Sequence, residues 1–280
     1  MARVQPRFEF GSLPRDADRD AALVEVRDAD HQRGDIVLSA ELTRKLDRTI
    51  AEYRDRDMLA KHALAPRSRL LFVGPPGCGK TLAADVLAAE LSLPLVYARF
   101  DGIVSSFLGE TATNLRRVFS YAAKAPSLLF FDEFDTIAKR RDDDQEVGEL
   151  KRVVGSFLQI LDSHPRDRLV VAATNHEGLL DEALWRRFDD VLVFRRPSVA
   201  QLAELLTMKL RGVRKPGVDI QMLAADMDGF TFADAERVCR EAIKTMVLGG
   251  AKELHADMLR AELEEQRARL RDVRTVTPAG

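Results

Sequence analysis

The sequence predicts an α/β fold in which a five-stranded parallel sheet is sandwiched between helices and is followed by a small all-helical domain. Two observations carry this prediction. Between residues 69 and 194 short apolar runs alternate with helical segments, and strands buried on both faces of a parallel sheet have such continuous apolar runs. After Ser198 the strand pattern disappears, and helical segments separated by glycine and proline follow.

Length and composition limit the class of protein. The chain has 280 residues, 46% of them hydrophobic, which is enough for a sizeable core. Its formal charge of −2 implies no general attraction to nucleic acid or anionic lipid. The two cysteines are not in CxxC spacing, so we expect no disulfide framework or zinc site. Without a signal-peptide pattern or an 18-residue uncharged stretch, we expect a cytoplasmic protein with no membrane partner.

The elements are expected in the following order. Residues 1–34 are rich in Arg and Asp and lack periodicity, which predicts a flexible tail. Residues 39–59 have apolar side chains at helical spacing. The expected strands are 69–73, 93–100, 127–131, 168–174 and 190–194, and the later helices are 198–212, 219–226, 232–249 and 256–273. The domains are then an α/β domain at 35–196, a helical domain at 197–273 and a tail at 274–280.

A phosphate-binding motif follows the first apolar run. The stretch GPPGCGKT matches G-x-x-x-x-G-K-[ST] between a predicted strand and a predicted helix, a context that a simple glycine turn does not require. Its amide N–H groups would surround phosphates at a helix N-terminus. Lys80 would reach the β- and γ-phosphates, and the Thr81 hydroxyl would bind Mg²⁺. The predicted nucleotide-binding residues are Gly74, Pro75, Pro76, Gly77, Cys78, Gly79, Lys80, Thr81, Leu82 and Asp132.

Polar residues at the ends of later strands complete the expected chemistry. Asp132, after LLFF, would hold Mg²⁺ through water, and Glu133 would polarise the water that attacks the γ-phosphate. Asn175 would orient that water. Each has a simpler alternative, because acidic pairs are common after strands and Asn is a common turn former. We read Asp135 as a helix cap.

Two arginines follow in the stretch LDEALWRRFDD. The guanidinium groups of Arg186 and Arg187 could stabilise the charge of phosphoryl transfer, but we expect them to lie far from their own phosphate loop and to serve a neighbouring chain. The alternative is a pair of surface arginines at a salt-bridged helix end.

Together these motifs resemble the AAA clade of AAA+ ATPases, from about Asp35 to Asp272. GPPGCGKT resembles its Walker A motif, LLFFDEFD its Walker B motif, AATN its sensor 1 and LDEALWRRF its arginine-finger segment, in a form nearer to spastin and katanin. The resemblance implies a P-loop NTPase fold with a helical lid, ATP or ADP with Mg²⁺ as cofactors, and a homo-oligomeric, hexameric ring in which Arg186 and Arg187 complete the adjacent site.

The stretch SSFLGET resembles the first pore loop of that clade. On this resemblance Phe107 and Leu108 contact a polypeptide substrate in a central channel, and Gly109 lets the loop move. Alternatively, Phe107 is a hydrophobic staple for the next helix, whose expected buried stripe is Ala112, Leu115, Phe119 and Ala122. Residues 139–149 are either a second pore loop or a solvated run of charges.

Three departures from the clade stand out. Phe232 occupies the place of a small glycine and could crowd the adenine or stack on it. No arginine begins that helix, so we expect no lid arginine sensor. Asp190 stands where a basic residue is common.

These observations favour a hexameric protein unfoldase or translocase. A nucleic-acid machine is the alternative that the near-neutral charge disfavours. Another is a nucleotide-gated scaffold controlling a separately encoded effector such as a protease, since no HExxH motif occurs in the chain.

Overall fold

The computed structural model describes residues 10–103, 108–134, 147–175 and 185–276. The chain divides into two compact units. The first comprises residues 1–36, 40–75 and 80–194, and the second comprises residues 37–39, 76–79 and 195–280. Within the described residues, no helix has the length and apolar character needed to cross a membrane.

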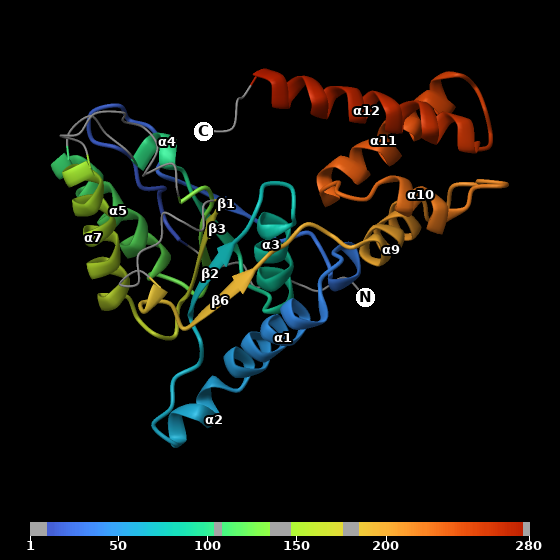
Figure 1. The fold of residues 1–280 in the computed structure, drawn as a ribbon. Coiled ribbons are helices and arrows are strands. Elements are labelled where there is room, and N and C mark those ends of the chain that lie inside the picture. The colour runs from blue at the N-terminus through green and yellow to red at the C-terminus, as the bar shows by residue number, and fades with distance from the viewer. Residues whose placement is uncertain (1–9, 104–107, 135–146, 176–184, 277–280) are drawn as a thin grey trace. The chain divides into compact units, whose positions relative to one another are not determined.

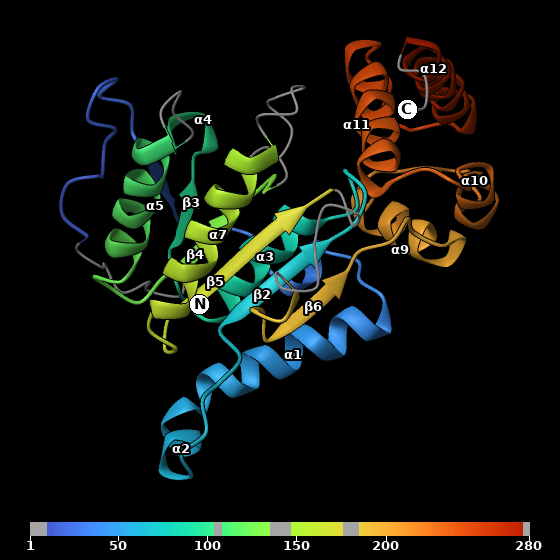
Figure 2. The same cartoon turned by 60° about the vertical axis from the view of Figure 1, so that its left-hand side comes forward.

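The first unit is built on a six-stranded sheet with the order β1-β3-β4-β5-β2-β6, of which Figure 1 labels β1 and Figure 2 labels the other strands. Its parallel strands are β2 (Arg69–Val73), β3 (Leu95–Ala98), β4 (Leu128–Phe131), β5 (Leu169–Thr174) and β6 (Asp190–Val193). Each lies within a predicted run, so the α/β class and the five parallel strands are confirmed. The sixth strand, β1 (Val24–Arg27), pairs antiparallel with β3 and was not predicted.

Helices cover both faces of this sheet. On one face α5 (Leu108–Ala122) packs with α7 (Val147–Ser163), and α1 (Ala40–Arg54) and α3 (Lys80–Glu90) lie on the other (Figures 1 and 2). Shorter helices are η1 (Arg33–Asp35), α2 (Arg56–Lys61) and α4 (Phe100–Ile103). The α5 face contains the predicted buried residues Leu115, Phe119 and Ala122, and these pack with Phe131 and Phe157.

The segment before residue 28 packs on the α/β unit. The Phe10 ring stacks on Tyr121 with 5.3 Å between centroids. Asp16 is buried and accepts a hydrogen bond of 2.6 Å from the Asn114 amide of α5. The backbone N–H of Arg19 and the Asn114 amide lower the pKa of Asp16. Residues 10–27 therefore form part of the folded unit, and Leu23 and Val24 of their short apolar run AALV are buried.

The second unit contains the four predicted helices α9 (Val199–Lys209), α10 (Ile220–Asp226), α11 (Phe232–Leu248) and α12 (Ala256–Val276). Ser198 and Thr231 cap the first turns of α9 and α11, and Asp219 caps α10. The helices bury a common core that includes Leu206, Val238 and Leu263. This unit thus has an apolar core of its own.

Candidate functional site

The phosphate-loop motif begins directly after β2, which lies between β5 and β6 in the sheet. Gly74 has a φ of 147°, and a Cβ there would lie 1.9 Å from the carbonyl oxygen of Phe194. The Gly74 N–H donates to Thr174 O at 3.2 Å, and the Phe194 N–H donates to Val73 O at 2.7 Å. Only glycine fits this close approach of β5 and β6 to the loop.

The middle of the motif belongs to the second compact unit. Gly77 has a φ of 74°, and its carbonyl accepts a hydrogen bond of 3.1 Å from the Ala233 N–H. A Cβ at Gly77 would approach the Thr231 hydroxyl to 2.8 Å. The next residue, Cys78, is buried. This part of the loop therefore packs against the first turn of α11.

Lys80 and Asn175 lie together, as the nucleotide-site prediction requires. The Lys80 ammonium donates to Gly74 O at 2.6 Å, to Pro75 O at 2.9 Å and to the Asn175 side-chain oxygen at 2.7 Å. Lys80 is 6% exposed, so these neutral oxygens surround a charge that is largely shielded from water. The fold thus positions a buried cation at the carboxyl edge of the sheet, where a phosphate would be stabilised.

Thr81 and Asp132 also lie together. The Thr81 hydroxyl donates to Asp132 Oδ2 at 2.7 Å. Both are oxygen ligands of the type that Mg²⁺ prefers, and they come from the start of α3 and the end of β4. The donor set therefore fits a hydrated Mg²⁺ ion.

Glu133 has an unusual backbone conformation. Its φ of 50° places it in the left-handed region, which costs a non-glycine residue about 1–2 kcal/mol. The turn is held by hydrogen bonds from the Glu133 N–H to Asp132 Oδ1 at 2.9 Å and from the Phe134 N–H to Ala173 O at 2.8 Å. The Glu133 side chain is exposed at this edge. Such strain is frequent at functional sites.

Arg186 and Arg187 lie at the opposite edge of the sheet, where the parallel strands begin. Arg187 is half exposed and pairs with Asp162, which also pairs with Arg69 at the start of β2. Asp189 ties the same segment to that strand start, because its Oδ2 accepts from the Arg69 N–H at 3.0 Å. Arg186 lies in the same turn. The length of β2, roughly 16 Å, therefore separates Arg187 from its own phosphate loop.

Several predictions lie outside the described residues. These are Phe107, Asp135 and most of the charged stretch 139–149. Leu108 and Gly109 are the first residues of α5. The pore-loop and staple interpretations of Phe107 both stay open.

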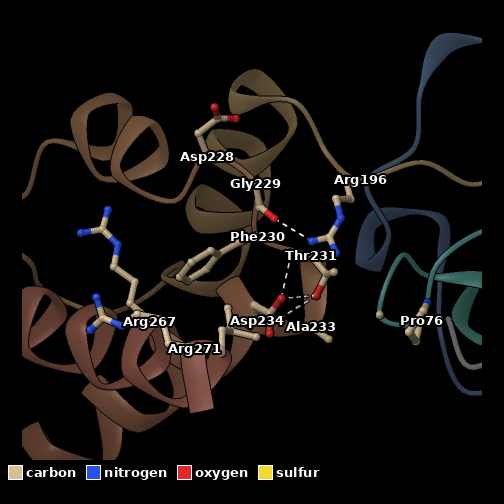
Figure 3. A pocket seen from close by; sticks show the side chains of 12 residues that line it. Pro76, Arg196, Asp228, Gly229, Phe230, Thr231, Ala233, Asp234, Arg267 and Arg271 are labelled. Carbon is tan, nitrogen blue, oxygen red and sulfur yellow. Dashed lines mark hydrogen bonds between the residues drawn. The ribbon is translucent and has the colours of Figure 1, made fainter. Parts of the chain in front are cut away.

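A cavity of about 700 Å³ lies in the second unit beside Gly77 (Figure 3). Its lining includes Thr231, Ala233, Arg196, Arg267 and Arg271. Phe232 is not among its lining residues and packs against the helical core. These arginines come from α12 and from the segment before α9.

Two further residues gain a structural explanation. Asp190 accepts a hydrogen bond of 3.0 Å from Lys45, which joins α1 to β6 and accounts for the acid at this position. The hydroxyl of Tyr97 on β3 donates to Asp132 Oδ2 at 3.3 Å. Nothing in the local sequence marks Tyr97 as part of the site.

Comparison with known proteins identifies the family of the chain. Residues 70–196 match the family described as ATPase family associated with various cellular activities (AAA). The chain is 46% identical over 250 residues to the uncharacterized AAA family ATPase y4kL of Sinorhizobium fredii, covering 89% of this chain and 76% of that protein. It is 33% identical over 237 residues to the ATP-dependent zinc metalloprotease FtsH 3 of Sphaerobacter thermophilus, covering 82% of this chain and 48% of that protein. The chain therefore belongs to the AAA family of ATPases and is an enzyme that hydrolyses ATP.

Proposed function

We propose that this ATPase is a protein-remodelling motor that assembles as a homo-hexameric ring and acts on polypeptide substrates. The similarity to FtsH 3, which is named as an ATP-dependent metalloprotease, supports protein as the substrate class. Both cysteines are buried as thiols rather than joined in a disulfide, which suits a cytoplasmic setting.

The separation of Arg187 from its own phosphate loop is the observation that supports assembly of several copies of the chain. An arginine side chain extends about 7 Å, which is less than half the roughly 16 Å length of β2. If Arg187 stabilises phosphoryl transfer, it must do so for ATP bound to another copy of the chain. Release from Asp162 would cost little, because half-exposed ion pairs contribute about 0–1 kcal/mol.

The remaining roles follow from the positions of the side chains. Lys80 binds the β- and γ-phosphates, and Asn175 beside it contacts the γ-phosphate and the attacking water. Thr81 and Asp132 would hold Mg²⁺, which neutralises phosphate charge when bound. Glu133 accepts the proton of the attacking water. Arg186 and Arg187 come from the adjacent copy.

Mixing two inactive variants tests this arrangement. Lys80→Ala removes phosphate binding but keeps Arg187, and Arg187→Ala does the reverse. We expect each alone to lose at least about 100-fold in ATP turnover. Random mixing in a ring pairs an intact loop with an intact arginine at one interface in four, so turnover should recover to about a quarter of the unmodified rate.

Arg48→Ala is the matched control, because Arg48 is an exposed arginine on α1. It should keep full turnover. If the mixture of Lys80→Ala and Arg187→Ala is no more active than either variant alone, the proposal that two copies share each site is overturned. Turnover stimulated by DNA and not by an unfolded protein would favour the nucleic-acid alternative, and turnover insensitive to both would favour the scaffold.

A further inference from the structure

Asp132 is held at both carboxylate oxygens. Oδ1 accepts the Glu133 N–H at 2.9 Å, and Oδ2 accepts the Thr81 hydroxyl at 2.7 Å and the Tyr97 hydroxyl at 3.3 Å. Three donors from different elements therefore define the plane of this carboxylate. Tyr97 is the donor that lies outside the recognised motifs.

The Tyr97 ring is itself held on two sides. On one side the Phe130 ring of β4 meets it edge-on with 5.6 Å between centroids. The Arg27 guanidinium of β1 lies 4.5 Å from the ring centroid. Glu25 fixes that guanidinium with hydrogen bonds of 2.7 and 2.8 Å. The strand that was not predicted therefore helps to aim the Tyr97 hydroxyl at Asp132.

The direction of these hydrogen bonds also leaves room for a cation. A protonated hydroxyl can only donate to a carboxylate. Because Thr81 also donates its proton to Asp132, the lone pairs of the Thr81 oxygen remain available to a cation.

We infer that Tyr97 is a positioning residue for the divalent-cation site, which holds Asp132 in the orientation that a cation beside Thr81 requires. This inference rests on the metal role proposed for Thr81 and Asp132. Residues that orient metal ligands in this way are commonly worth tenfold or more in metal affinity. The Tyr97 hydrogen bond is long, so we expect an effect at the lower end of that range.

The test is the Mg²⁺ dependence of nucleotide binding by Tyr97→Phe, which removes the hydroxyl and keeps the ring. A fluorescent ADP is titrated at several Mg²⁺ concentrations and in EDTA. The Mg²⁺ concentration that gives half of the affinity gain should rise roughly 3- to 10-fold. Affinity in EDTA should not change, and turnover should return to the unmodified rate at saturating Mg²⁺.

Tyr121→Phe is the matched control, because Tyr121 is a buried tyrosine of α5 and stacks on Phe10. It should leave the Mg²⁺ dependence unchanged. An unchanged Mg²⁺ dependence in Tyr97→Phe overturns the inference, and so does an equal loss in EDTA, which would show a general structural role. Asp132→Asn tests the underlying metal role separately, since that role fails if this variant binds ADP with normal Mg²⁺ dependence.

Discussion

His164, directly after α7, is a buried ionisable side chain. It is 7% exposed, and its ring meets Phe119 edge-on with 5.2 Å between centroids. Among the described residues its Nε2 atom has no hydrogen-bond partner. Burial lowers the pKa of His164 to about 4, and the positive charges of Arg69 and Arg168 contribute. The folded protein thus holds this imidazole neutral.

This burial predicts a pH-dependent stability. Above about pH 6.5 the imidazole is neutral in both the folded and the unfolded chain, and its contribution to stability is complete. Between pH 6.5 and 4 only the unfolded chain gains the proton, so the free energy of unfolding falls by about 1.4 kcal/mol per pH unit. From pH 7 to 5 the unmodified protein should lose about 2 kcal/mol more than His164→Phe.

The measurement is urea unfolding followed by the fluorescence of Trp185, the single tryptophan, which packs against the α/β core. His255→Asn is the control, because His255 is exposed. If the free energy of unfolding changes equally with pH in the unmodified protein and in His164→Phe, the buried imidazole is not the cause of the pH dependence.

At the scale of elements, the success of sequence reasoning depended on burial. Strands β2 to β5 are covered on both faces, so their side chains form uninterrupted apolar runs that the sequence displays. Strand β1 is an edge strand, and only Val24 of its four residues is buried. Its charged residues are explained by their exposure to solvent, and Arg27 also contacts the Tyr97 ring. A local sequence pattern could not reveal that pairing.

Two glycines predict opposite responses to the same change. Gly74→Ala should destabilise the α/β unit by about 3 kcal/mol or more, because the new methyl group meets the Phe194 backbone and φ is 147°. Gly155 lies inside α7, and a methyl group added there would meet no atom within 4 Å among the described residues. Gly155→Ala should therefore stabilise by about 0.5–1 kcal/mol through helix propensity.

Urea unfolding followed by Trp185 fluorescence measures both variants. A stable Gly74→Ala protein would show that the end of β6 can move away from the loop, contrary to the packing described for Phe194.

For the whole molecule, the motifs predicted that Lys80, Thr81, Asp132 and Asn175 belong to one site, and the structure brings Lys80 to Asn175 and Thr81 to Asp132. The sequence predicted that Arg187 lies far from its own phosphate loop. It could not predict the distance, roughly 16 Å, because that distance depends on β6 lying beside β2. Tyr97 was missed for a related reason, since its role depends on the neighbouring strand β4.

The proposed motor makes a prediction about substrate contact. Phe107→Ala should keep basal ATP turnover within about twofold, because position 107 lies outside the phosphate motifs, but should lose the unfolding of a protein probe with an unstructured tail. Loss of probe fluorescence in the presence of ATP is the measurement. If Phe107→Ala unfolds the probe at the normal rate, Phe107 does not grip the substrate and the staple interpretation is favoured.

The buried Asp16–Asn114 hydrogen bond has a practical consequence for protein engineering. A truncation that keeps only residues 70–196, the stretch that the family shares, would delete β1 and remove the Asp16 acceptor from the Asn114 amide. It would also bare the hydrogen-bonding edge of β3, a template on which separate molecules pair and precipitate. Shortened versions made for expression should therefore keep residues 10–27.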